Sequence, residues 1–331
     1  MKEFIWVAEP KDYSPKALRI YRELGQVHEA TESENSKKDH PDFPKATILV
    51  VRLKYTIDKF WFDKMPNLKV IATPTTGLNH IDMAEAEKRG IKIISLRGHT
   101  EFLDKITSTA EETIGLMIAL VRKLPWAFDY VKVGGWVNRD KFRGHELAHK
   151  TLGILGLGRL GRMVARYALA MDMNVIASDP NVAETDMEKL GLRKVSMEEL
   201  FRESDVLSVH VLLTDGTRNL VKAEHFNLMK PDAYFVNTAR AEIIEQGVLE
   251  TALENKFIAG AAVDVMWGEE GGLKFEGQLK NNRLWNYAKT HDNLIIVPHI
   301  GGATYEAMAI TEDFIADLVS KHFLEQQTQK T

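Results

Sequence analysis

Short apolar runs alternate with stretches of helical periodicity along the first hundred residues. The apolar runs predict strands, at Phe4–Ala8, Thr47–Arg52, Val70–Thr73 and Ile91–Ser95. The stretches between them predict helices, at Pro15–Leu24, Ile57–Met65 and Asp82–Arg89, and the polar stretch Thr31–Lys45, which contains two prolines, predicts a loop. Strands that alternate with helices in this way build a parallel sheet, so the pattern favours an α/β fold.

The same alternation returns in the second half of the chain. A long helix is expected from about Thr107, where Ser108 and Glu111 have the spacing of a capping box. Further strands are expected at Leu152–Leu155, Asn174–Ser178, Val206–Val209, Ala233–Asn237, Ile258–Val263 and Leu294–Val297. The last periodic stretch, Tyr305–Phe323, predicts a helix that packs back on the first domain before a polar tail. The chain thus predicts two parallel-sheet domains.

Length and composition fit two ordinary globular domains and narrow the function. The chain has 331 residues, 44% of them hydrophobic and 27% charged, and its net charge is -4. We find no basic stripe of the kind that indicates nucleic-acid binding. No apolar run reaches the roughly 18 residues of a membrane span, and the first residues read as a strand and not as a signal peptide. The sequence has no cysteine, which excludes thiolate chemistry and fits a reducing, cytoplasmic setting.

A glycine-rich loop links the strand Leu152–Leu155 to the helix that follows it. Gly156, Gly158 and Gly161 form the pattern G-x-G-x-x-G. The first glycine permits a tight turn, the second lets the backbone approach a pyrophosphate, and the third lets helix and strand pack closely. The helix that begins at Arg159 would turn its N–H groups and positive dipole end toward the phosphates. This context indicates dinucleotide binding, against the alternative of a loop kept only for packing.

Asp179 ends the next strand, 18 residues beyond Gly161. This is close to the ~20 residues expected for the carboxylate that binds the adenosine ribose hydroxyls. A carboxylate there repels a 2′-phosphate, so we expect NAD as the cofactor in preference to NADP. The alternative is a simple Asp-Pro turn.

Three chemically capable side chains follow the ends of later strands. They are Arg240, Glu269 and His299. Ligands of open α/β sheets sit outside the carboxyl ends of the strands, which is also where the glycine loop lies. A guanidinium could hold a carboxylate, a protonated imidazole could donate a proton to a keto oxygen, and a glutamate could orient that imidazole. The set suits reduction of a 2-keto acid, although each residue alone could be a loop arginine, a surface acid or a capping histidine.

Five separated motifs give the chain a family resemblance. Between about Ala46 and Ala309 it resembles the D-isomer-specific 2-hydroxyacid dehydrogenases, especially the 3-phosphoglycerate dehydrogenase branch. The motifs are Gly77–Asp82, Gly153–Gly161, Asn237–Arg240, Ala261–Asp264 and Pro298–Gly302. The resemblance implies two Rossmann-like domains, with an NAD-binding domain at 106–299 inserted into a split, flavodoxin-like substrate domain at 1–105 and 300–331. It also implies a cytoplasmic NAD-dependent oxidoreductase, a homodimer, and a 2-hydroxy or 2-keto acid substrate without nucleic-acid or membrane partners.

The resemblance also assigns individual residues. Arg240, Glu269 and His299 match the family's catalytic residues. The matching NAD contacts are Gly156, Gly158, Arg159, Leu160, Gly161, Asp179, His210, Val211, Thr217, Thr238, Ala239, Arg240, Asp264, His299, Gly301 and Gly302. The matching substrate residues are Thr76, Gly77, Leu78 and Arg240, with Arg52 and Lys54 where the phosphoglycerate branch places basic side chains near a phosphate.

The chain departs from the family pattern at several places. Glu270 stands where proline is usual, so either Glu269 or Glu270 could pair with His299. Ala241 replaces a glycine and Leu212 a proline, and the long segment 96–105 bears on the choice of substrate. The regulatory domain of the longer phosphoglycerate dehydrogenases is missing, so we do not expect feedback control by serine.

Two other functions fit parts of the sequence. His145-Glu146-Leu147-Ala148-His149 spells the H-E-x-x-H signature of zinc proteases. A strand is expected three residues later, which leaves no room for the helix this signature needs, so we expect no metal site. The second alternative is a non-catalytic NAD-sensing interaction protein on the same fold, which a test for turnover would distinguish.

Overall fold

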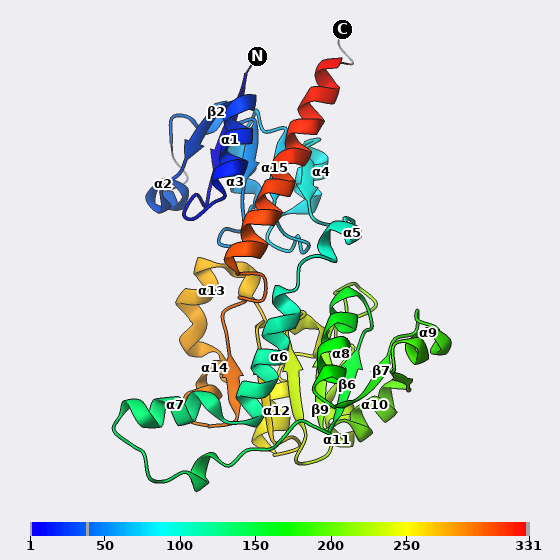
Figure 1. Cartoon of the computed structure of the whole chain (residues 1–331). Helices are drawn as coiled ribbons and strands as arrows, with labels where there is room; N and C mark the ends of the chain where they lie inside the picture. The colour runs from blue at the N-terminus through cyan, green and yellow to red at the C-terminus, as the bar shows by residue number, and fades with distance from the viewer. Residues whose placement is uncertain (1, 38–39, 329–331) are drawn as a thin grey trace. The chain divides into compact units, whose positions relative to one another are not determined.

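The computed structural model describes residues 2–37 and 40–328, and the chain divides into two compact units (Figure 1). Unit 1 holds residues 1–105, 268–277 and 304–331, and unit 2 holds residues 106–267 and 278–303. These limits differ from the expected ones at two places. The segment 268–277 belongs to unit 1 and not to the NAD-binding domain, and the C-terminal part of unit 1 begins at Thr304 and not at residue 300. The two units are described separately below.

Unit 1 is built on a five-stranded, fully parallel sheet with the strand order β2-β1-β3-β4-β5. This is the flavodoxin-like order, in which the chain reverses direction between β1 and β3. The strands are β1 (Glu3–Val7), β2 (Gly25–Glu29), β3 (Ile48–Val50), β4 (Val70–Thr73) and β5 (Lys92–Ser95). The helices are α1 (Pro15–Leu24), α2 (Glu32–Lys37), α3 (Lys59–Lys64), α4 (Met83–Lys88), α5 (Thr100–Leu103) and α15 (Tyr305–Thr328), and α13 (Leu273–Gln278) begins in this unit.

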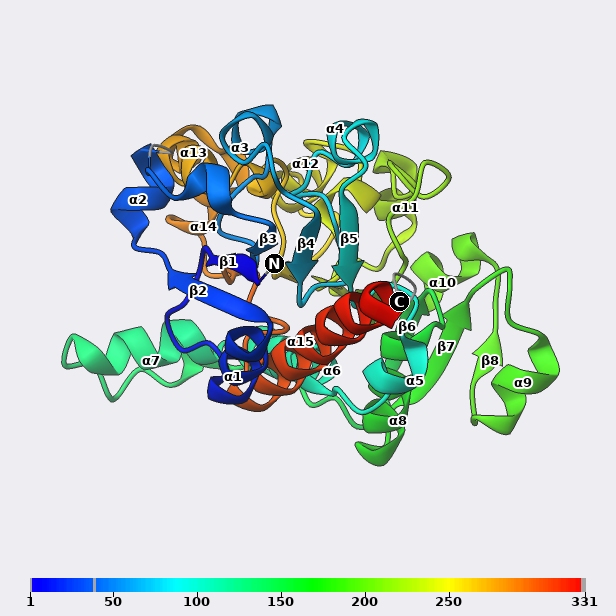
Figure 2. The same ribbon diagram turned by 90° about the horizontal axis from the view of Figure 1, so that it is seen from above.

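Helices cover both faces of the unit 1 sheet (Figure 2). Helices α1 and α15 lie side by side on one face, which confirms the expected return of the last helix to the first domain. Helices α3 and α4 cover the other face, over a core that includes the fully buried rings of Trp6, Trp61 and Phe62. These burials explain why the apolar runs form strands here, since parallel strands are covered on both faces.

Unit 2 contains a seven-stranded parallel sheet with the order β12-β11-β10-β9-β6-β7-β8. The order reverses at β6, which makes the sheet doubly wound with a switch point between β6 and β9. Its strands are β6 (Thr151–Leu155), β7 (Asn174–Ser178), β8 (Arg193–Lys194), β9 (Val206–Val209), β10 (Tyr234–Asn237), β11 (Gly260–Val263) and β12 (Leu294–Ile296). Its helices are α6 (Ser108–Val121), α7 (Leu124–Lys132), α8 (Arg159–Ala170), α9 (Glu184–Lys189), α10 (Met197–Glu203), α11 (Ala223–Leu228), α12 (Val248–Glu254) and α14 (Arg283–Ala288). The expectation of two parallel-sheet α/β domains is therefore confirmed.

Several local expectations were wrong. The stretch expected to be a loop, 31–45, contains α2 and a short 3₁₀ helix at Phe43–Lys45, and strand β2 was not foreseen. The expected capping box at Ser108 and Glu111 does not form, because Thr107 takes the cap position and donates its hydroxyl to Glu111 at 2.5 Å. Helix α15 extends through residues expected to be a polar tail, of which 329–331 lie outside the described residues. Within the described part of the chain, no helix is both long and apolar enough to cross a bilayer.

Candidate active site

The glycine loop of unit 2 has the geometry of a phosphate cradle. Gly156 has a φ of 91°, and a side chain there would meet the backbone of His210 and Val211 at 2.9–3.0 Å. At Gly161 an added Cβ would collide with the carbonyl oxygen of Gly156. At Gly158, in contrast, nothing lies within 4 Å of the place of a Cβ, so the backbone is open on that side. Gly156 and Gly161 thus satisfy close packing, and Gly158 leaves room at the start of α8, where the positive end of the helix dipole favours an anion.

Asp179 follows the last residue of β7 and is hydrogen-bonded to this loop. Its Oδ2 accepts a hydrogen bond from the N–H of Leu157 at 2.8 Å, and its Oδ1 accepts one from Asn181 at 2.8 Å. The carboxylate is therefore fixed beside the loop rather than free in solvent. Its position next to the loop is consistent with the predicted ribose contact.

His299 lies in a strained turn directly after β12. Its φ is 53°, in the left-handed region that is uncommon for residues other than glycine, although asparagine, aspartate and histidine adopt it more often than the rest. The turn is held by Asp264, which follows β11 and is 1% exposed. Asp264 accepts hydrogen bonds from the N–H groups of Ile300 at 2.6 Å and Gly301 at 2.9 Å. Strain of this kind persists only where surrounding contacts impose it, and it occurs often at active sites.

Glu112 of α6 lies next to Asp264, and the sequence analysis did not single it out. Its carboxylate lies beside Gly301 and Asp264, because a Cβ added at Gly301 would be 2.6 Å from Glu112 Oε2 and 3.0 Å from Asp264 Oδ2. Burial, with the neighbouring Asp264 charge, raises the pKa of Glu112 to about 8. Burial also raises the pKa of Asp264, although the positive charge of His299 opposes this shift. One signal was available, since Glu112 precedes the buried Leu116 by four residues and so shares its helix face.

Arg240 follows β10 on a turn that buried polar groups hold in place. The amide of Asn237, which is 1% exposed, donates to the Arg240 carbonyl at 3.0 Å and accepts the Ala239 N–H at 3.0 Å. Thr238 pairs with the Thr113 hydroxyl at 2.8 Å, and the Arg240 guanidinium donates to the Ala239 carbonyl at 2.7 Å. The turn thus presents a half-buried guanidinium at the carboxyl end of the sheet.

The loop after β9 carries the other predicted cofactor contacts. His210 is hydrogen-bonded to Ser208 at 2.8 Å, and burial lowers its pKa to about 4, so its ring is neutral. Val211 lies against the glycine loop, because a Cβ added at Gly156 would be 2.9 Å from the Val211 backbone nitrogen. The Thr217 hydroxyl donates to the Leu212 carbonyl at 2.6 Å and accepts the Thr214 N–H at 2.7 Å. These bonds give the loop a fixed shape at the switch point of the sheet.

The predicted substrate loop of unit 1 follows β4. Thr76 is exposed, while Gly77 and Leu78 are half-buried. The Thr75 hydroxyl donates to the Gly77 carbonyl at 2.8 Å and pairs with the Thr73 hydroxyl at 3.0 Å, which shapes the turn. In the long segment 96–105, the Phe102 ring stacks on Phe314 of α15, with centroids 3.8 Å apart.

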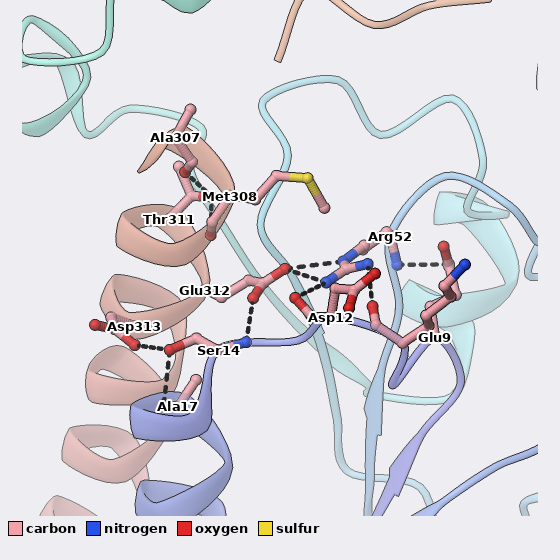
Figure 3. Close-up of polar contacts among 11 residues, drawn as sticks. Glu9, Asp12, Ser14, Ala17, Arg52, Ala307, Met308, Thr311, Glu312 and Asp313 are labelled. Carbon is pink, nitrogen blue, oxygen red and sulfur yellow. Dashed lines mark hydrogen bonds and ion pairs between the residues drawn. The ribbon is translucent and has the colours of Figure 1, made fainter. Parts of the chain in front are cut away.

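Arg52 and Lys54 are both occupied by acidic side chains of unit 1. The Arg52 guanidinium donates to Glu312 Oε1 from Nε at 2.9 Å and from Nη2 at 2.5 Å (Figure 3). It also contacts the Lys11 and Asp12 carbonyls and lies over the Tyr13 ring at 5.0 Å. Lys54 pairs with Glu32 of α2. The structure thus provides internal partners for the two cations that the sequence analysis assigned to a substrate phosphate.

Glu269 and Glu270 begin the segment 268–277 of unit 1. Glu269 is half-buried and Glu270 is exposed. The segment is fixed to unit 1 by the Thr56 hydroxyl, which donates to the Glu270 carbonyl at 2.7 Å. Since His299 belongs to unit 2, the pairing of either glutamate with His299 stays a prediction.

The H-E-x-x-H pentapeptide forms a connecting turn, as expected. Residues 145–149 are not helical, and His149 has a φ of 64°. The two histidines consequently lack the one-turn helical spacing that a zinc protease site requires.

Comparison with known proteins identifies a family for this arrangement. Residues 114–301 match the model described as "D-isomer specific 2-hydroxyacid dehydrogenase, NAD binding domain". A D-3-phosphoglycerate dehydrogenase of Archaeoglobus fulgidus is 35% identical over 94% of this chain and 56% of its own length. A hydroxypyruvate reductase of Thermotoga maritima is 33% identical over 92% of both chains. This chain spans about half the length of the archaeal D-3-phosphoglycerate dehydrogenases that it matches.

A solved structure extends the similarity to the whole fold. The D-lactate dehydrogenase of Aquifex aeolicus, solved with NAD and lactic acid, is 27% identical and has a TM-score of 0.78. The match covers 99% of this chain and 97% of that one. The dehydrogenase and reductase names agree with the expected oxidoreductase class. The chain therefore belongs to the D-isomer specific 2-hydroxyacid dehydrogenase family, and its unit 2 carries the family's NAD-binding domain.

Proposed function

We propose that this protein is an NAD-dependent D-2-hydroxyacid dehydrogenase that interconverts a 2-keto acid and a 2-hydroxy acid. The observation that carries the proposal is the His299 turn. Asp264 accepts the two backbone N–H groups that follow His299 and so holds His299 in a left-handed backbone conformation. This turn lies at the same edge of the sheet as the glycine loop. The left-handed backbone and the two bonds to Asp264 together fix the position of the His299 side chain, as a proton donor requires.

NADH, when bound along the glycine loop, supplies the hydride. The side chains of the protein handle the charge and the proton. His299 donates a proton from its imidazolium to the keto oxygen. General-acid help of this kind typically contributes about 10²–10⁴-fold to the rate.

Arg240 and Glu269 complete the proposed site. The Arg240 guanidinium holds the substrate carboxylate, for which its planar fork suits a two-point hydrogen bond. Glu269 orients the His299 imidazole, and its partial burial favours it over the exposed Glu270 for this role. The Thr76–Leu78 loop supplies backbone groups to the substrate carboxylate.

We propose a substrate without a phosphate as the first candidate. The Arg52 guanidinium is already bound to a Glu312 side chain that is 1% exposed, so a phosphate would have to displace a buried ion pair. A phosphorylated, 3-phosphoglycerate-like acid is the second candidate. It is favoured by Lys54, which is one-third exposed, and by the names of the archaeal relatives.

The test is the loss of NADH absorbance with a panel of 2-keto acids that includes phosphorylated members. The His299→Ala variant should lose at least about 10²-fold in kcat while its NADH affinity stays within a few-fold of the parent. His299→Asn is the matched control, because asparagine tolerates the left-handed backbone but cannot act as the acid. If NADH binds and no acid turns over in the parent, either the panel lacks the substrate or the protein is an NAD-sensing interaction protein. Equal loss of binding and turnover in both variants would assign His299 a structural role.

We further propose a homodimer, which the exposed apolar side chains of α7 support. We also propose a cytoplasmic location, which the absence of cysteine supports.

A further inference from the structure

Two histidines and a glutamate converge at one end of the unit 1 sheet. His28 lies on the edge strand β2, Glu34 on α2, and His40 in the loop that follows. The Nε2 atom of His28 is 3.4 Å from Glu34 Oε1, and the Nε2 atom of His40 is 3.2 Å from the same oxygen. Among the described residues, this is the one group of three ligand atoms that all lie within 4.8 Å of one another.

These separations match the spacing of ligands around a tetrahedral zinc ion. With Zn–N and Zn–O distances of about 2.0–2.1 Å, two ligands at the tetrahedral angle lie about 3.3 Å apart. The buried Nε2 atom of His28 faces the Glu34 carboxylate but meets no ordinary hydrogen-bond geometry within the described chain.

The glutamate is held in the orientation that a metal ligand needs. Its other oxygen, Oε2, accepts hydrogen bonds from the Thr31 N–H at 2.6 Å and the Thr31 hydroxyl at 2.9 Å. Oxygen Oε1 is thereby fixed toward the two imidazoles. Outer contacts that orient a ligand in this way are typical of metal sites.

Aromatic packing fixes the two rings. The Trp6 ring is fully buried, stacks on His28 with centroids 4.2 Å apart, and meets His40 edge-on at 5.2 Å. His40 Nδ1 accepts the Asp42 N–H at 3.2 Å, and the Asp42 carboxylate lies 4.0 Å away. The bond from Asp42 and the packing against Trp6 hold the His40 ring in one orientation, with Nε2 toward Glu34.

We propose that His28, Glu34 and His40 form a binding site for a divalent transition metal of the zinc class, with water as the fourth ligand. The two-histidine, one-carboxylate donor set suits Zn²⁺ in preference to Mg²⁺ or Ca²⁺, which choose oxygen ligands. The site is separate from the residues proposed for hydride transfer and does not depend on that function. It departs from the sequence-based expectation that the chain has no metal site.

The test is metal binding by the full chain after treatment with EDTA and removal of the chelator. Zn²⁺ titrated in a calorimeter should bind one ion per chain. Co²⁺ used as a spectroscopic probe should give the strong visible absorption of tetrahedral coordination. His28→Gln and His40→Gln should each weaken Zn²⁺ binding by more than the roughly 10–100-fold that loss of an outer contact costs. The matched control is the double variant His145→Gln/His149→Gln, which removes the other histidine pair and should bind as the parent does.

A second measurement uses the unaltered chain, so it tests the proposal even if the variants fail to fold. Zn²⁺ should protect His40, whose side chain is partly exposed, from histidine-specific acylation with diethylpyrocarbonate, mapped by mass spectrometry, and should leave His145 and His149 reactive. Loss of binding in the His145/His149 variant alone would overturn the assignment. So would the absence of saturable binding up to about 100 µM Zn²⁺, or equal acylation of His40 with and without the metal.

Discussion

The Asp264 carboxylate shows how one side chain can set the geometry of a turn. It accepts two successive backbone N–H groups, and this pair of bonds stabilises the left-handed conformation of His299. The neighbouring Glu112 is part of the same environment, because both carboxylates lie beside Gly301. Two acids so close together in a buried place cannot both ionise without cost, and this has a measurable consequence.

Glu112 should make unit 2 less stable as the pH rises. Its pKa is raised from 4.5 to about 8, so between these values the folded state keeps a proton that the unfolded state releases. The free energy of unfolding then falls with rising pH across that window. The Glu112→Gln variant mimics the protonated form. Its melting temperature should therefore equal that of the parent at pH 4.5 and exceed it at pH 9. Calorimetric melting from pH 4.5 to 9 measures this difference.

Glu111→Gln is the matched control, because Glu111 is the exposed neighbour bonded to Thr107. A Glu112 variant that melts in parallel with the parent at every pH would contradict the assignment.

Asp179 should control the preference between NADH and NADPH. Its charge repels a 2′-phosphate, while its oxygens also accept the Leu157 and Asn181 N–H groups. Asp179→Asn keeps one acceptor oxygen and removes the charge, so the NADH preference should narrow by about tenfold, equivalent to ~1.4 kcal/mol. Titration of protein fluorescence with each cofactor gives the ratio. A ratio equal to that of the parent would mean that the carboxylate does not face the ribose.

At the scale of elements, α15 is joined to the unit 1 sheet by an internal ion pair. Glu312 receives the Arg52 guanidinium and also accepts the Ser14 N–H at 2.6 Å, at the start of α1. Arg52→Met would leave a buried carboxylate without its counter-charge. The expected loss of stability is about 3 kcal/mol, measured by chemical unfolding.

The double variant Arg52→Met/Glu312→Leu should regain most of that stability, since a well-packed apolar pair replaces a buried ion pair at little cost. Turnover assays on the same variants examine the substrate. A rise in KM confined to phosphorylated acids in Arg52→Met would show that Arg52 binds the phosphate after all.

Elements with strong local signals could be predicted from the sequence. The bounds of α1 agree with the expectation because Ser14 caps it and Pro15 begins it, and α8 begins where the glycine loop ends. Strand β2 was missed because it is a polar edge strand with no buried side chain. The Arg52–Glu312 pair was beyond sequence reasoning, since its members are 260 residues apart. The same holds for the segment 268–277, because local periodicity does not say which sheet a segment joins.

At the scale of the whole molecule, the exposed apolar side chains of α7 and of the loop after it form a surface that we expect another protein chain to cover. No residue of α7 is buried, and the apolar side chains exposed there and in the following loop are Leu124, Phe128, Val131, Val133, Trp136 and Val137. A surface of this kind usually marks a protein interface. The family resemblance implies a homodimer joined through the nucleotide domain, and this element belongs to unit 2.

We expect the chain to sediment as a dimer and the Phe128→Glu/Trp136→Glu variant to sediment as a monomer at micromolar concentration. Analytical ultracentrifugation measures both. Phe60→Glu, at a partly exposed apolar residue of unit 1, is the control and should remain dimeric. A dimeric double variant would place the interface elsewhere.

The chain order of the two units also affects how the protein is made. Unit 2 ends at Ala303, before α15, the last element of unit 1, emerges from the ribosome. At roughly 5–20 residues per second, the 260 residues between Arg52 and Glu312 take about 13–50 s to synthesise. During that time the oldest part of the nascent chain lacks one of the two helices that cover one face of its sheet. Unit 2, although made later, is complete first, and a chain stalled after Ala303 would carry a finished nucleotide domain beside an unfinished unit 1.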